Sequence, residues 1–149
     1  MGFVAAATDA IIMSQFGRLG LTGPEVIEEE LGKDEFDASD RALVYRTTGG
    51  RHKYIMGDCN LLAADSICDF RKNLQDVLSQ PYADIAEMAC IGNLEKVEAQ
   101  LELVNLCVKI APKDAKDVWK HAGNEAPDTL VDMSLEEFRR TVKRLAKTC

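Results

Sequence analysis

The sequence predicts a mainly α-helical, single-domain protein that is built as a helical bundle. Two long segments carry apolar residues at helical spacing, and a third segment begins with a helix-capping motif. The composition agrees with a folded domain, because 46% of the 149 residues are hydrophobic and only 4 are proline. A chain of this length can bury a core of its own without disulfides or metal ions.

Two long helices are expected, one within 60–79 and one within 93–110, and each is followed by a proline that ends it. Apolar residues recur in both at alternating intervals of three and four positions, which is the period of one helix face. They are Ala63, Ile67, Phe70, Leu74 and Val77 in the first helix, and Leu94, Val97, Leu101, Val104 and Val108 in the second. We expect these two apolar faces to pack lengthwise and to form the base of the bundle.

A third helix is predicted over 134–147. The stretch from Ser134 to Glu137 is a capping box, in which the two side chains satisfy free backbone N–H groups at the start of the helix. Apolar residues at helical spacing would pack this helix on the other two, and basic residues occupy the rest of its surface. The basic residues that we name as candidate interaction residues are Arg139, Arg140, Lys143 and Arg144.

The first forty residues are predicted to form an acidic N-terminal arm. They contain nine acidic and two basic residues, so this part alone carries a charge of −7, equal to the net charge of the chain. Short helices are expected at 3–16 and 22–32, the second with Pro24 in its first turn. We therefore divide the chain into an arm, 1–40, and a helical domain, 41–149, which together form one compact unit.

Two local structures fit the segment 44–56, which contains Gly49-Gly50. In the first, the glycines form the turn of a small β-hairpin that pairs Tyr45 with Tyr54 but sets Arg46 against Lys53. In the second, a short helix runs through Tyr45 and ends at the glycines. The predicted fold class therefore includes a hairpin near 44–56 as an option.

Four residues in this segment form the other set of candidate interaction residues, because they could contact an anion: Arg46, Arg51, His52 and Lys53. The surrounding sequence lacks the glycine spacing of a phosphate-binding loop. The five cysteines lack zinc-ligand spacing, and the acidic stretch 34–40 does not fit a calcium loop. No nucleophile stands beside a base in a known catalytic motif. The sequence thus predicts no metal site, no cofactor and no enzyme activity.

The predicted function is that of a non-catalytic accessory or adaptor subunit, which docks on other proteins in a larger assembly. The uneven charge along the chain favours protein partners, whereas the overall acidity disfavours nucleic acid. No segment is apolar enough to span a membrane, although peripheral membrane contact stays open. The alternative is a small regulatory protein that binds an anionic ligand or nucleic acid through the basic 46–53 loop. Unpaired cysteines indicate a soluble protein in an intracellular, reducing compartment, either the cytoplasm or an organelle interior.

Overall fold

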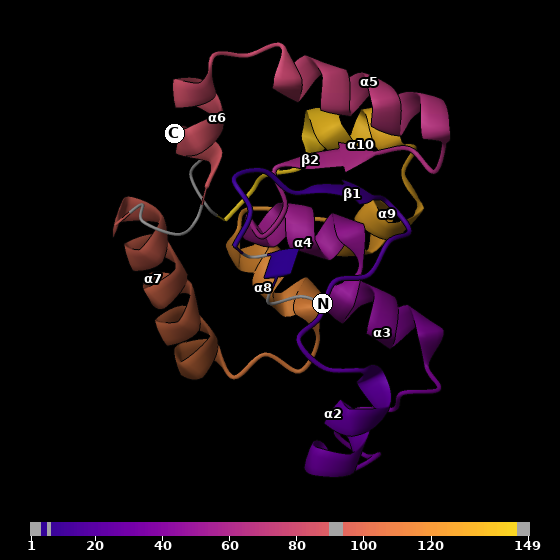
Figure 1. Ribbon diagram of the computed structural model, residues 1–149. Helices are drawn as coiled ribbons and strands as arrows, with labels where there is room; N and C mark the ends of the chain where they lie inside the picture. Colours follow the sequence, from indigo (N-terminus) through magenta and orange to yellow (C-terminus); the bar gives the residue numbers. More distant parts are fainter. Residues whose placement is uncertain (1–3, 6, 90–93, 146–149) are drawn as a thin grey trace.

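The structure is a computed structural model, and it describes residues 4–5, 7–89 and 94–145 (Figure 1). Its elements are mainly helices, which confirms the predicted fold class, with one small sheet. In chain order they are β1 (Ile12–Ser14), α2 (Pro24–Leu31), α3 (Arg41–Thr48), α4 (Gly50–Met56), β2 (Leu61–Ala63), α5 (Ile67–Leu78), α6 (Tyr82–Met88), α7 (Leu94–Ile110), α8 (Ala115–His121), α9 (Pro127–Asp132) and α10 (Leu135–Thr141).

The sheet consists of the two short strands β1 and β2, which run parallel, with Met13 paired to Leu62. Both of these side chains are buried. Parallel strands need a crossover between them, and here it is formed by α2, α3 and α4. The outer edge of β2 is covered by the C-terminal part of the chain, because the guanidinium of Arg139 donates to the carbonyl oxygen of Leu62.

The core forms where the sheet and α4 meet the last three helices. Its largest fully buried side chains include Trp119 from α8 and Phe138 from α10. The buried cluster consists of Met13, Ile55, Cys59, Leu62, Ala115, Trp119, Leu130 and Phe138. The cluster joins segments that are far apart in the sequence, from Met13 in β1 to Phe138 in α10.

The prediction that the helices at 60–79 and 93–110 form the base of the bundle is wrong. Residues 61–63 are a strand, α5 buries only Val77, and α7 has no buried residue. In Figure 1, α7 lies at the periphery, away from the sheet and from α9 and α10. Helical periodicity reveals an amphipathic face, but it does not reveal what covers that face.

Of the two structures predicted for 44–56, the hairpin does not form. The helix that runs through Tyr45 and ends at the glycines is present as α3, and α4 follows it directly. The carboxylate of Asp40 caps α3 by accepting from the backbone N–H groups of Ala42 and Leu43. The backbone of Gly50 lies so close to β1 that a Cβ there would overlap the carbonyl oxygen of Ser14. The glycine pair therefore serves close packing between elements rather than a hairpin turn.

The two ends of the chain partly follow the predictions. The helix at 22–32 is confirmed as α2. The predicted helix at 3–16 is wrong at 12–14, which form β1, and residues 3 and 6 of that prediction lie outside the described residues. The serine half of the predicted capping box is present, because the hydroxyl of Ser134 accepts from the backbone N–H of Glu137 at 3.2 Å. However, α10 ends at Thr141 because the chain turns toward α4, where Leu145 donates its N–H to the carbonyl oxygen of Ile55 at 2.8 Å. The division at residue 40 stays a prediction.

Within the part of the chain that the structure describes, no helix combines the length and the apolar character that crossing a bilayer requires.

Candidate functional site

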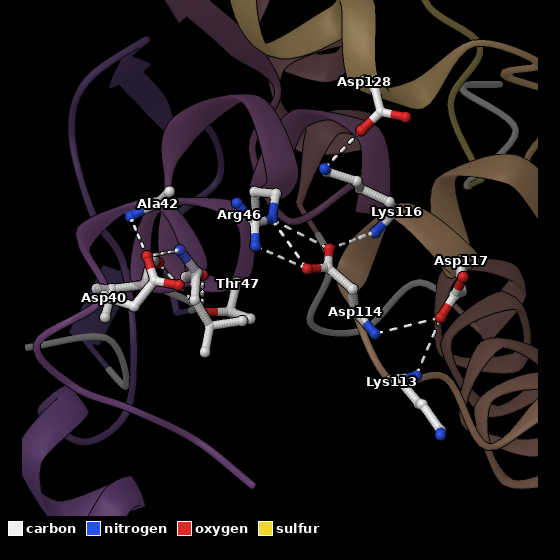
Figure 2. Close-up of polar contacts among 11 residues, drawn as sticks. Asp40, Ala42, Arg46, Thr47, Lys113, Asp114, Lys116, Asp117 and Asp128 are labelled. Atoms are coloured by element: carbon white, nitrogen blue, oxygen red, sulfur yellow. Dashed lines mark hydrogen bonds and ion pairs between the residues drawn. The ribbon is translucent and has the colours of Figure 1, made fainter. Parts of the chain in front are cut away.

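The predicted basic segment 46–53 lies in α3 and α4, and its first member binds α8. The guanidinium of Arg46 forms a fork with the carboxylate of Asp114, with Nε–Oδ2 and Nη2–Oδ2 distances of 3.0 and 2.8 Å (Figure 2). Asp114 also caps α8 by accepting from the backbone N–H of Lys116 at 3.0 Å. Burial opposes ionisation of Asp114, but the hydrogen bonds from Arg46 and Lys116 lower its pKa below the usual value.

Figure 2 also shows how this contact is braced on the α8 side. The carboxylate of Asp117 accepts from the backbone N–H groups of Lys113 and Asp114, which completes a capping box. The ammonium of Lys116 pairs with Asp128 in α9. The contact between Arg46 and Asp114 therefore connects α3 with a rigid junction of α8 and α9.

Arg51 is a buried cation whose partners are mainly backbone carbonyl groups. Its guanidinium donates to the carbonyl oxygens of Leu130 and Met133, at 2.5 and 2.6 Å, and to Oε1 of Gln15 at 2.9 Å. The guanidinium carbon lies 4.9 Å from the ring centroid of Phe138. Arg51 thus links the strand region with the end of α9 and with α10, so its charge stabilises the fold.

His52 and Lys53 are also engaged within the chain. His52 accepts a hydrogen bond from the indole N–H of Trp119 at its Nδ1 atom, and the two nitrogens are 3.0 Å apart. Burial, together with the nearby charge of Lys53, lowers the pKa of His52 to about 4. The ammonium of Lys53 pairs with Asp58 at 2.8 Å. The segment is helical and not a loop, and it does not present these four side chains as one open anion cradle.

The four candidate residues near the C-terminus divide into two pairs. Arg139 and Arg144 bind backbone carbonyls of the core region, and Arg144 donates to those of Tyr54 and Cys59 at 2.9 and 2.8 Å. Arg140 and Lys143 are exposed. The structure therefore brings Arg144 onto α4, but it does not gather the predicted basic residues into one patch. Whether any of the eight contacts a partner stays a prediction.

A different surface stands out in the structure, on α7. We call it the α7 stripe and define it as Leu94, Val97, Leu101, Val104 and Val108, whose exposed fractions lie between 41% and 78%. The sequence pattern indicates these residues as a set but assigns them to the core. Their exposure shows an apolar helix face that the described residues do not cover.

The described residues contain no group of three or more histidine, cysteine, aspartate or glutamate side chains arranged to hold a metal ion. Cys59 is fully buried, and this burial raises the pKa of its thiol to about 12.

No protein-family model matches the chain. The malonyl-S-ACP:biotin-protein carboxyltransferase MADC of Malonomonas rubra is 67% identical to it over 145 residues, which are 97% of this chain and 46% of the relative. The chain thus spans about half the length of this relative. A chain in the crystal structure of a Pseudomonas malonate decarboxylase hetero-tetramer in complex with malonate is 32% identical, with a TM-score of 0.49. That match covers 51% of this chain and 28% of the solved one.

These comparisons correct one prediction and agree with another. The prediction that the chain is not an enzyme is contradicted by the carboxyltransferase that matches 97% of it. A local side-chain motif is not required for such an activity, because backbone N–H groups and residues distant in sequence can together build an active site. The predicted docking on other proteins is consistent with the name of the Malonomonas rubra relative, which includes a biotin-protein.

Proposed function

We propose that this chain is part of an enzyme that transfers a carboxyl group from a malonyl thioester to a biotin held on a protein. The observation that carries the proposal is the 67% identity to the Malonomonas rubra carboxyltransferase over 97% of the chain. At this identity the buried residues, the capping residues and the glycine contacts described above can be kept with little change. The proposal extends to this chain the reaction in the relative's name.

The proposed reaction breaks one C–C bond and forms one N–C bond. The bond between the free carboxyl carbon and the methylene carbon of the malonyl group breaks, and its electrons stay on the thioester as an enolate. The ureido nitrogen of biotin binds the carboxyl carbon, and the proton of that nitrogen goes to the enolate carbon. The products are an acetyl thioester and carboxybiotin. Such a reaction needs donors for the enolate oxygen, which backbone N–H groups can supply, and it needs no nucleophilic side chain.

The contribution of this chain to such an enzyme is a rigid, internally paired body. Arg46 and Arg51 use their charges to join its elements to one another, so they hold the fold in one geometry. Because the chain spans 46% of the relative's length, we assign the remainder of the reaction centre to polypeptide beyond the matched region. The body described here would support and position that remainder.

The test is carboxyl transfer by the assembly that contains this chain. The chain is tagged, the assembly is purified from its native cells, and radiolabelled malonyl-S-ACP is added together with a biotinylated acceptor protein. We expect label on the acceptor after avidin capture, and none on a matched acceptor without biotin. Release of labelled carbon dioxide with no label on biotin would contradict the proposal, as would label on the acceptor lacking biotin.

A further inference from the structure

Helix α7 has three lengthwise stripes, each with residues at alternating intervals of three and four. The α7 stripe is apolar and exposed, and a second apolar stripe, on the nearly opposite face of the helix, is half-buried. The third stripe is polar and largely acidic. The half-buried stripe contains Ala99, Leu103, Leu106 and Ile110, and the polar stripe contains Glu95, Glu98, Glu102, Asn105 and Lys109. One apolar stripe therefore faces the chain itself, which leaves the α7 stripe as a second apolar face that needs another partner.

The spacing of the α7 stripe is that of a helix seam. Leu94, Leu101 and Val108 are seven residues apart, and Val97 and Val104 lie between them, which is the pattern that packs against a second helix or a flat apolar surface. Single exposed apolar residues are ordinary on protein surfaces, but a continuous row along a helix of 17 residues marks an interaction surface.

The total surface of the chain supports this interpretation. The accessible area is 9722 Å² for a mass of 16.4 kDa. A compact monomer of that mass exposes about 7,500 Å². The difference of roughly 2,200 Å² is larger than the ~800 Å² that one partner contributes to a standard interface. The chain thus has the excess surface expected of a protein that is covered by a partner.

We propose that the α7 stripe is the docking surface for the rest of the carboxyltransferase. By this we mean the polypeptide that corresponds to the unmatched 54% of the relative, since the match covers 46% of it. This inference rests on the proposed function. A partner of that size is large enough to cover the α7 stripe, because the unmatched part of the relative is longer than the chain itself.

A second copy of the chain is a poorer occupant for the α7 stripe. Two copies would bring together chains with a net charge of −7 each. The polar stripe beside the seam carries Glu98 and Glu102, so pairing α7 with itself would add acidic flanks along the contact. Charge complementarity instead favours an apolar surface with a basic rim, and the interaction should weaken as salt concentration rises.

Site-specific cross-linking in the native assembly identifies the occupant. A photo-crosslinking amino acid is introduced at Val104, or at Val26 of α2 as the control, and cross-linked peptides are sequenced by mass spectrometry. We expect the Val104 probe to yield peptides that align with the unmatched part of the relative, and the Val26 probe not to do so. Cross-links from Val104 to a second copy of the chain, to an unrelated protein or to nothing would overturn the proposal.

Matched variants test whether the stripe supplies affinity. L101D/V104D places two charges in the stripe, and V26D/L31D places the same two charges on exposed apolar positions of α2. We expect L101D/V104D to lower recovery of the partner at least about 30-fold, because a charge in a desolvated contact is costly. V26D/L31D should recover as much partner as wild type. Circular dichroism checks that both variants are folded, and the milder L101S replaces L101D/V104D if that variant is not. Equal recovery with all variants would count against the stripe.

The outcomes separate this inference from the proposed function. An assembly that forms through the α7 stripe but transfers no carboxyl group would refute the function and leave the docking surface intact. An active assembly whose formation does not depend on the stripe would refute the docking surface and leave the function intact.

Discussion

The indole N–H of Trp119 donates to Nδ1 of His52 across 3.0 Å, and this bond connects α8 with α4. His52 can accept it only as the neutral imidazole that carries its proton on Nε2. Burial lowers the pKa of His52 to about 4, so the neutral form persists well below neutral pH. Protonation would remove the acceptor and place a charge beside the core.

The stability of the protein should therefore fall as the pH falls. The folded pKa of His52, about 4, lies below its ordinary value of 6.5, so unfolding takes up a proton between these limits. The stabilising contribution is complete above pH 6.5 and is lost as pH falls toward 4, by about 2 kcal/mol between pH 7.5 and pH 5. Urea unfolding, followed by the fluorescence of Trp119, measures this loss.

The variant His52→Asn separates His52 from the acidic residues, which also titrate at low pH. Asparagine keeps an acceptor for Trp119 but has no proton to gain, so the loss between pH 7.5 and pH 5 should shrink by about 2 kcal/mol. His121 is exposed, and His121→Asn is the control that should leave the loss unchanged. An unaltered pH dependence in His52→Asn would mean that His52 is not the titrating group.

The contact between Arg46 and Asp114 gives a second prediction. Asp114→Ala removes the cap of α8 together with the fork, so we expect a loss of roughly 2–4 kcal/mol in the free energy of unfolding. Asp114→Asn keeps a capping oxygen and should lose less. The double variant with Arg46→Met measures the coupling. If the effects of Asp114→Ala and Arg46→Met simply add, the fork contributes nothing of its own.

Local rules predicted the elements that depend on local contacts. Pro24 begins α2 and Ser134 caps α10, because each acts on backbone groups within one turn. The parallel pairing of Met13 with Leu62 could not be predicted in this way, since it joins residues that are distant in sequence and each strand has only three residues. Strands that short carry too little alternation to be distinguished from a helix segment.

The candidate basic residues were grouped because they are neighbours in the sequence. Successive residues of a helix point in directions about 100° apart, so Arg51, His52 and Lys53 reach three different parts of the fold. The sequence does contain a signal that the α7 stripe is not part of the core. A helix with apolar stripes on two nearly opposite faces has more apolar surface than one side of a small domain can cover, and Leu103 and Ile110 already belong to the half-buried stripe.

For Gly50→Ala we expect a loss of stability, which is the opposite of what helix propensity alone predicts. Gly50 is the first residue of α4, and alanine at a helical position normally stabilises by up to about 1 kcal/mol. A Cβ at Gly50 would overlap the carbonyl oxygen of Ser14, which belongs to a strand and cannot move alone. We expect Gly50→Ala to destabilise by about 1–3 kcal/mol in thermal or urea unfolding. Gly23→Ala is the control, because its Cβ would meet only the flexible carboxylate of Glu25. Equal stability of the two variants would refute the close approach of Gly50 to β1.

The cysteines should differ widely in reactivity. Cys59 is fully buried, and burial raises its pKa to about 12 although Arg144 opposes the shift, so at pH 8 about one thiol in ten thousand is ionised. Cys68 is exposed on α5. Brief treatment of the folded protein with iodoacetamide, followed by peptide mass spectrometry, should modify Cys68 and leave Cys59 intact. In urea both should react, which shows that folding and not local sequence protects Cys59. Modification of Cys59 at the rate of Cys68 in the folded protein would place Cys59 outside the core and contradict the packing of β2 against α4 and α10.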